Sequence, residues 1–182
     1  MLRNFIYAKE NFLLDEECDE IIKFFKKIPE KIFYKFGNYE GVYLTDDSDY
    51  LKDDKLSFLK DRFQTALNEY IKLYPELNFV KPFYLTEIRF KHWKADNFFD
   101  SWHSEHSEET PNRILNFMIY LSTHDCGTQF LDKRIIKSEK GKLVIMPSYF
   151  THTHRGMPCP EKKDRYMIGG YFNFKNIKHE KK

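Results

Sequence analysis

Cysteine is scarce in this chain of 182 residues, which contains three. Cys18, Cys126 and Cys159 are widely separated, and no C-x-x-C pair occurs. An odd number of distant cysteines is typical of a protein from a reducing compartment, without a disulfide framework. The pattern therefore predicts free thiols, with Cys159 as an ordinary loop thiol.

Long apolar runs are also missing. No stretch approaches the ~18 apolar residues that a membrane helix needs, so the sequence predicts no membrane partner. Charged and polar residues at positions 9–11 interrupt the first fifteen residues, which argues against a secretory signal.

An excess of one charge is missing too, because 30 basic and 28 acidic residues leave a net charge of +2. This balance predicts no nucleic-acid partner, and the lysines at 175–182 are interpreted as a solvated terminus.

Aromatic residues, in contrast, are abundant. The chain contains 18 phenylalanines and 12 tyrosines, which a disordered chain would not carry. We attribute this excess to core packing and to a genome composition that also favours Lys, Ile and Asn over Ala. The length suits one domain over residues 1–182, and no repeat or linker divides it.

The chain has a helical residue pattern in its first part and a strand-like pattern in its second part. Apolar residues at three- and four-residue steps predict helices over 15–28 and 54–74, with a hairpin over 31–44 between them. From residue 82 onward, short aromatic and β-branched runs predict antiparallel strands. The expected fold is α+β and mainly β, with a helical cover over 1–80 packed on one sheet of a β-rich core over 82–174. The predicted strands are 83–92, 99–105, 113–122, 127–131, 135–136, 142–146, 151–154 and 165–174.

Two of the regions that carry the seven histidines stand out, at 102–106 and at 151–156. In an extended strand, His103 and Glu105 project from the same face. A histidine from a later strand would complete two imidazoles and one carboxylate with open coordination positions, the ligand set of non-haem Fe(II) oxygenases. H-x-E alone also fits a hydrogen-bonded surface pair, so the spacing by itself leaves both interpretations open.

Six short motifs follow the H-x-E pattern or contain it: W-H-S-E at 102–105, N-F-M-I-Y-L-S at 116–122, G-T-Q-F at 127–130, G-K-L-V-I-M-P at 141–147, H-R-G-M-P at 154–158 and R-Y-M-I at 165–168. In type and order they resemble the Fe(II)/2-oxoglutarate-dependent dioxygenase superfamily. The resemblance is to its prolyl-4-hydroxylase-like branch, and small phage-type members look closest. It covers about 83–174 and implies a double-stranded β-helix, or jelly roll.

The resemblance implies roles for five residues. His103, Glu105 and His154 match the iron ligands, through which catalysis would proceed. Arg165 and Tyr120 match the groups that bind the far carboxylate of 2-oxoglutarate. An arginine suits this role because its planar guanidinium meets a carboxylate with two parallel hydrogen bonds. The implied cofactors are Fe(II), 2-oxoglutarate as cosubstrate and O2, with ascorbate as a further candidate.

Several positions depart from the family pattern. Glu105 replaces the usual aspartate but keeps a carboxylate, which favours hydroxylation over halogenation. Asp125 and Cys126 stand where the family's turn has two glycines. Gly169 replaces a polar residue, and Phe90 stands about where a tyrosine often lies near the metal.

The remaining histidines receive lesser roles. His152 lies two positions before His154 and is the alternative ligand, although the motif favours His154. His106 is interpreted as a hydrogen-bonded loop histidine, and Trp102 as core or site-rim packing. His92, His124 and His179 carry no spacing signal and are interpreted as surface residues.

The implied reaction is hydroxylation of an unactivated C–H bond, most of all in a prolyl residue of a peptide or protein, with release of succinate and CO2. The alternatives are hydroxylation of a free amino acid or other small molecule, a non-catalytic jelly-roll binding module, and a zinc hydrolase using His103, His106 and either His152 or His154. The missing H-E-x-x-H and C-x-x-C motifs count against the hydrolase.

Candidate substrate loops are 36–53 and 96–102. The expected location is the cytoplasm, or the host cytoplasm for a phage-encoded chain, and the oligomeric state stays open.

Overall fold

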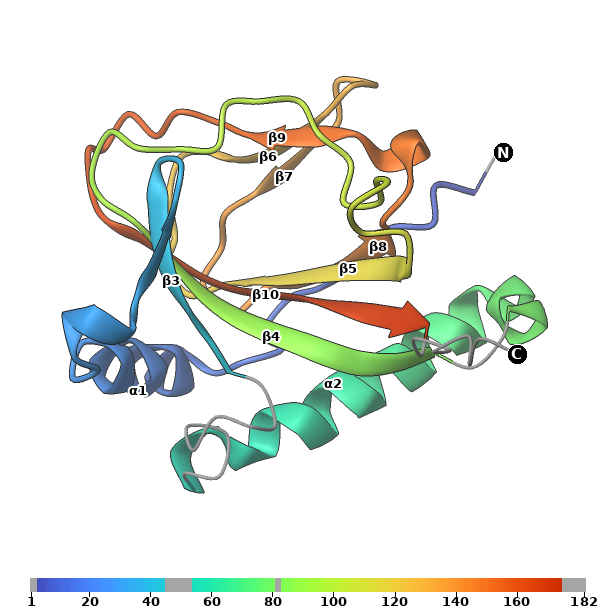
Figure 1. Cartoon of the computed structure of the whole chain (residues 1–182), viewed down its shortest axis with the longest axis horizontal. Helices are drawn as coiled ribbons and strands as arrows, with labels where there is room; N and C mark the ends of the chain where they lie inside the picture. The colour runs from blue at the N-terminus through green and yellow to red at the C-terminus, as the bar shows by residue number, and fades with distance from the viewer. Residues whose placement is uncertain (1–2, 45–53, 81–82, 175–182) are drawn as a thin grey trace, which may run out of the picture.

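Two antiparallel sheets and two α-helices build the part of the chain that the computed structural model describes, residues 3–44, 54–80 and 83–174 (Figure 1). The helices are α1 (Asp15–Phe25) and α2 (Asp54–Leu73), and short 3-10 helices occur at Glu30–Ile32, Pro75–Phe79 and Phe150–His152. The strands are β1 (Tyr7–Lys9), β2 (Tyr34–Phe36), β3 (Tyr39–Tyr43), β4 (Phe83–Trp93), β5 (Arg113–Tyr120), β6 (Gly127–Phe130), β7 (Ile135–Lys137), β8 (Leu143–Pro147), β9 (His154–Gly156) and β10 (Arg165–Phe174).

The larger sheet has seven strands in the order β1-β8-β5-β10-β4-β3-β2, and the smaller sheet has three in the order β7-β6-β9. Figure 1 shows the smaller sheet above one face of the larger sheet and both helices against the opposite face. This arrangement is the jelly roll, or double-stranded β-helix, with N-terminal helices on one sheet that the sequence predicts.

The helices form where the apolar periodicity predicts them. In α1 the buried side chains are Cys18, Ile21 and Phe25, which recur at three- and four-residue steps. This helix ends three residues before the predicted boundary, because the backbone tightens to 3-10 bonds ahead of Pro29. No helix in the described ranges is both long and apolar enough to cross a bilayer.

The strand β5 separates two apolar layers. Its residues at odd positions, Leu115, Phe117 and Ile119, belong to the core that includes the helices. Alternate residues of a strand point to opposite faces, so Met118 and Tyr120 belong to a second cluster on the inner side of the sheet. The inner face of the larger sheet is therefore available to build a site, while the outer face anchors the helices.

Two predicted strands are wrong. Residues 99–105 form an irregular segment in which His103 makes an isolated β-bridge with His154. Beyond it, the backbone N–H groups of Glu105 and His106 both donate to the Ser148 carbonyl, which turns the chain out of the ladder. Residues 151–154 begin in a 3-10 helix, and the strand there starts at His154.

The prediction of free cysteines is also wrong. Cys126 and Cys159, which are 33 positions apart in the sequence, are joined in a disulfide with their Cα atoms 5.0 Å apart. Pairing of β6 with β9 brings the start of β6 beside the loop that follows β9, so topology creates a contact that sequence spacing does not reveal. The remaining cysteine, Cys18, is free and buried.

Candidate active site

Three side chains meet on the inner side of the jelly roll. The donor atoms of His103, Glu105 and His154 lie within 4.8 Å of one another. Oε1 of Glu105 is 3.6 Å from Nε2 of His103 and 3.7 Å from Nε2 of His154. Two backbone hydrogen bonds, of 3.0 and 2.9 Å, tie the two histidines together. The structure thus brings together the three residues singled out in the sequence, through a β-bridge instead of a continuous strand.

The imidazoles are oriented for metal binding. Nδ1 of His103 lies 3.0 Å from the Ser101 carbonyl, and Nδ1 of His154 lies 2.9 Å from the His152 carbonyl. We assign the Nδ1 protons to these bonds, which leaves both Nε2 atoms available as metal ligands. Burial and the neighbouring His103 lower the pKa of His154 to about 4, so this imidazole is neutral at neutral pH.

The carboxylate of Glu105 remains ionised although its side chain is only 11% exposed. Burial acts to raise the pKa of Glu105, but the adjacent His103 and the ammonium of Lys91 outweigh burial. Together they hold the pKa well below its usual range. One carboxylate and two imidazoles therefore face a common point, a donor set that suits Fe(II).

The two oxygens of Glu105 have different partners. Oε2 accepts a hydrogen bond of 2.5 Å from the Tyr171 hydroxyl, and Arg113 Nη1 lies 3.4 Å from the same oxygen. Oε1 faces the histidines and accepts from Asn116 Nδ2 at 3.2 Å. Sequence reasoning gave none of these three neighbours a role, because strands β5 and β10 bring them to the loop residue Glu105.

A cavity of about 450 Å³ adjoins the three donors, and both Arg165 and Tyr120 line it. The Arg165 guanidinium donates to the carbonyls of Asn97 at 2.8 Å and Met157 at 3.3 Å. The Tyr120 hydroxyl lies 2.7 Å from the Thr128 hydroxyl. The structure thus places a cation and a phenol in the same cavity as the three donors.

Aromatic side chains form another part of the cavity wall. Many come from the β2–β3 hairpin, which belongs to the first 80 residues and pairs with β4. Of the two candidate substrate loops, residues 45–53 lie outside the described ranges, whereas Phe36 and Phe99 line the cavity. The aromatic lining consists of Tyr34, Phe36, Tyr39, Tyr43, Trp93, Phe99, Phe117, Tyr120, Tyr166 and Tyr171. The aromatic excess therefore shapes this cavity as well as the core.

The alternative ligand His152 points elsewhere. Its Nε2 lies 2.8 Å from the Asn4 carbonyl and its Nδ1 lies 2.9 Å from the Thr151 hydroxyl. Both ring nitrogens are engaged in these contacts, so His152 is not part of the donor cluster. His106 is a loop histidine, as predicted, with Nδ1 3.3 Å from the Arg113 carbonyl.

Other sequence assignments are corrected. His92 is not a free surface residue, because Glu40 and Asp164 each lie 2.9 Å from one of its ring nitrogens. His124 is 5% exposed and therefore buried. Phe90 packs into the helix-side core and not near the donor cluster. His179 lies outside the described residues, and Trp102 is 41% exposed beneath the Arg155 guanidinium.

Comparison with known proteins agrees with this geometry. Residues 88–173 match the family model described as the 2OG-Fe(II) oxygenase superfamily. Over these residues the chain is similar to this superfamily. It is a 2-oxoglutarate-dependent dioxygenase, and the family implies Fe(II), 2-oxoglutarate and O2 as cofactors. No curated protein matches it in sequence.

Solved structures share the fold of this oxygenase. A viral collagen prolyl hydroxylase from Paramecium bursaria Chlorella virus-1, in complex with 2-oxoglutarate, has a TM-score of 0.68 at 18% identity, covering 92% of this chain and 95% of that one. A prolyl-4-hydroxylase from Pseudomonas putida has a TM-score of 0.71 at 14% identity, covering 93% and 92%. A prolyl hydroxylase from Trichoplax adhaerens, bound to a fragment of a hypoxia-inducible factor, has a TM-score of 0.66 at 12% identity, covering 93% and 84%.

Proposed function

We propose that this oxygenase binds Fe(II) through His103 Nε2, Glu105 Oε1 and His154 Nε2. The observation that carries the proposal is their convergence within 4.8 Å on the wall of a cavity. When bound, the iron with 2-oxoglutarate and O2 supplies the oxidising chemistry that yields succinate and CO2 and converts a substrate C–H to C–OH. The residues of the chain hold the metal, orient both substrates and exclude water.

Arg165 and Tyr120 are proposed to bind the far carboxylate of 2-oxoglutarate. Both side chains line the cavity, and Arg165 begins β10 while Tyr120 ends β5. A guanidinium has five N–H donors, so the contacts of Arg165 with Met157 and Asn97 leave donors for a bidentate pair with a carboxylate. The buried Tyr120 hydroxyl adds a hydrogen bond to the same group.

The proposed substrate is a prolyl residue in a peptide or protein. The cavity wall formed by Tyr34, Tyr39 and Trp93 resembles in chemistry the aromatic-lined grooves that bind extended proline-rich segments. The three solved structures compared above are also named prolyl hydroxylases, and one holds a peptide fragment. These likenesses support, at the level of the fold, a site that is accessible to a peptide.

A second candidate is a free amino acid or another small carboxylate. Lys91 lines the same cavity as Glu105, and its ammonium lies close to Gly169, where no side chain intervenes. A lysine in the cavity that is additional to Arg165 favours a substrate with an acidic group. Free proline therefore belongs in the same assay as the peptides.

An anaerobic titration tests the cofactor assignment. Fe(II) is added to the purified chain, followed by 2-oxoglutarate, and the visible charge-transfer band of the iron–2-oxoglutarate complex is recorded. We expect the band in the wild-type chain and its loss in His154→Ala. In Arg165→Ala we expect the concentration of 2-oxoglutarate needed for half-saturation to rise at least about tenfold, because a charge-assisted bidentate contact is lost.

Arg155→Ala is the matched control for the arginine substitution. Arg155 donates to Gln129 and lies over the Trp102 ring, and it does not line the cavity. Its titration should equal that of the wild type. A missing band in the wild-type chain, or a band unchanged in His154→Ala, would refute the assignment of the site.

The substrate is tested by succinate formation with a panel of proline-rich peptides and free L-proline. The prolyl-peptide proposal expects stimulation by a peptide and, by mass spectrometry, the gain of one oxygen on a prolyl residue. Stimulation by free proline alone would establish the second candidate instead. Absence of stimulation by every peptide would overturn the peptide proposal and leave the cofactor assignment intact.

A further inference from the structure

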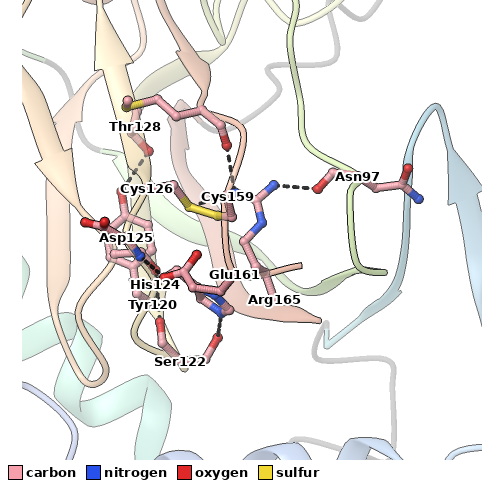
Figure 2. The surroundings of a disulfide bond; sticks show 12 residues. Asn97, Tyr120, Ser122, His124, Asp125, Cys126, Thr128, Cys159, Glu161 and Arg165 are labelled. Atoms are coloured by element: carbon pink, nitrogen blue, oxygen red, sulfur yellow. Dashed lines mark hydrogen bonds between the residues drawn. A yellow bond between two sulfur atoms is a disulfide. The ribbon is translucent and has the colours of Figure 1, made fainter. Parts of the chain in front are cut away.

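A second group of potential ligands lies where the loop 157–164 meets the segment before β6. The donor atoms of His124, Cys159 and Glu161 lie within 4.8 Å of one another, and Cys126 adds a second sulfur because it is bonded to Cys159. The sequence supplies them as two short motifs, H-x-C at 124–126 and C-x-E at 159–161. Figure 2 shows the disulfide with His124 and Glu161 close to it and Arg165 on another side.

The imidazole of His124 has an unused nitrogen in this group. Its Nε2 lies 2.9 Å from the Ser122 hydroxyl, whereas its Nδ1 is buried without a hydrogen-bond partner. The whole residue is 5% exposed and therefore buried. Oε2 of Glu161 is also buried without a partner, while Oε1 accepts from the backbone N–H of Asp125. His124 and Glu161 thus each bring a buried polar atom to a group that contains two sulfurs.

We propose that, when the disulfide is reduced, His124, Cys126, Cys159 and Glu161 bind one zinc ion. Two thiolates, an imidazole and a carboxylate form the kind of four-coordinate donor set that Zn²⁺ prefers in structural sites. The site is distinct in its residues from the Fe(II) ligands and is additional to the oxygenase activity.

The reaction that opens the site is a thiol–disulfide exchange with a dithiol reductant. Two electrons from the dithiol break the bond between Cys126 and Cys159, the dithiol becomes a cyclic disulfide, and its two protons pass to the protein sulfurs. Zinc binding then releases these two protons, because thiolates are the ligands. Zn–S bonds of about 2.3 Å place the sulfurs about 3.8 Å apart. Side chains on Cα atoms 5.0 Å apart reach this spacing by rotation about their Cα–Cβ bonds.

The surroundings balance the charge of the proposed site. Two thiolates and the Glu161 carboxylate carry three negative charges, and zinc leaves one of them uncompensated. The Arg165 guanidinium, with Nη1 3.5 Å from Cys126 Sγ, offsets part of this charge, and the proposed contact with 2-oxoglutarate shares the same guanidinium. A nearby guanidinium also favours the thiolate form of a cysteine. Zinc would therefore tie the loop 157–164 to the start of β6 beside the guanidinium of Arg165.

Cobalt(II) is the probe that separates this site from the Fe(II) site. The chain is reduced anaerobically with a water-soluble phosphine, freed of reductant and titrated with Co²⁺. Thiolate ligands give Co²⁺ an intense near-ultraviolet charge-transfer band, and histidine and carboxylate ligands do not. We expect this band to reach its maximum with one Co²⁺ bound at the sulfurs, to disappear when Zn²⁺ is added, and to be absent in the oxidised chain.

Substitutions assign the band to its ligands. Cys159→Ser should abolish it, and His124→Ala should weaken the apparent affinity at least about tenfold. Cys18→Ser is the matched control, because Cys18 is the free cysteine elsewhere in the fold, and it should leave the band unchanged. His103→Ala should also leave it unchanged, so the result is independent of the proposed Fe(II) site. A reduced wild-type chain without the band, or a band that persists in Cys159→Ser, would overturn the zinc site.

A second test uses the wild-type chain, so that it remains informative if a substituted chain fails to fold. The reduced protein is treated with a maleimide with and without Zn²⁺, and each cysteine peptide is quantified by mass spectrometry. Zinc should slow alkylation of Cys126 and Cys159 by at least about tenfold, as expected for metal-bound thiolates. Alkylation of these two cysteines at the same rate with and without zinc would refute the proposal.

Discussion

Glu105 uses its two carboxylate oxygens for different purposes. Oε1 faces His103 and His154, while Oε2 is held by the Tyr171 hydroxyl and lies near Arg113. The longer glutamate side chain therefore needs lateral support, which β10 and β5 provide. Tyr171 is a positioning residue, because it acts on the metal site through Glu105.

Removing this support should weaken metal binding without removing a ligand. We expect Tyr171→Phe to lower the Fe(II) affinity of the anaerobic chain about tenfold, in the range found when a hydrogen-bond partner of a metal ligand is lost. Isothermal titration calorimetry measures the change. Tyr84→Phe is the control, because Tyr84 is 51% exposed and does not line the cavity. Equal affinities in Tyr171→Phe and the wild type would contradict the positioning role.

Adjacent glycines in β10 should respond differently to alanine. A Cβ at Gly170 would collide with the Glu87 carbonyl oxygen and the Phe117 ring, whereas a Cβ at Gly169 meets the flexible end of Lys91 at 3.4 Å. We expect Gly170→Ala to cost more than about 3 kcal/mol and Gly169→Ala to change the free energy of unfolding by less than about 1 kcal/mol. Urea denaturation of both variants checks this difference. Equal costs would show that the sheet relaxes around position 170.

At the scale of elements, one ion pair joins the two helices. Arg62 in α2 binds both carboxylate oxygens of Glu17 in α1, at 2.7 and 2.6 Å, and also donates to the Phe12 carbonyl at 3.2 Å. This bidentate geometry is stronger than an ordinary surface pair.

Arg62→Ala should therefore lower the free energy of unfolding by about 1 kcal/mol, a value limited by the partial exposure of both side chains. Arg3→Ala is the control, since the Arg3–Glu76 pair is more than half exposed, with side-chain exposures of 54% and 55%. It should cost less than about 0.5 kcal/mol. Chemical denaturation of the two variants compares them, and an equal loss in both would argue against a special role of the helix pair.

Elements with a strong local pattern were predictable from the sequence. The helix α2 follows its apolar period to Leu73, and β10 begins and ends at the predicted residues. Segment 99–105 was not predictable, because its aromatic residues favour a strand while its backbone bonds go to His154 and Ser148. The strand propensity of a segment does not predict which distant residues its backbone will bond to.

The donor cluster was proposed from ordered motifs, and its surroundings were not. Tyr171 is 66 positions from Glu105, and only the register of the larger sheet brings the two together. The same holds for the disulfide, where the pairing of β6 with β9 decides which cysteines meet. A short motif identifies the ligand residues themselves, whereas the residues that contact those ligands depend on how distant strands pair.

At the scale of the whole molecule, buried histidines connect pH to stability. Burial lowers the pKa of His152, whose side chain lies near the charges of Arg134 and Asp132. Unfolding exposes the imidazole, so the unfolded chain binds a proton that the folded chain resists. The contribution to stability is full above the unfolded pKa of about 6.5 and is lost as the pH falls below it.

We therefore expect the metal-free chain to lose stability from pH 7 to pH 5, by at most about 1.4 kcal/mol per pH unit for each such histidine. His152→Gln should make this dependence shallower, and both proteins should show the same flat profile between pH 7 and pH 8. Urea denaturation at each pH, in the presence of a chelator, measures the slopes. An unchanged slope in His152→Gln would show that other groups govern the acid response.

The two faces of β5 have a practical consequence for engineering. Leu115 and Ile119 face the helices, whereas Asn116, Met118 and Tyr120 line the cavity, and Phe117 belongs to both surroundings. A library that varies only the first set would alter thermal tolerance while leaving the reacting groups in place. A library that varies only the second set would sample new substrates on an unchanged scaffold. Apart from Phe117, one strand thus offers two separate design problems, distinguished by whether a residue number is odd or even.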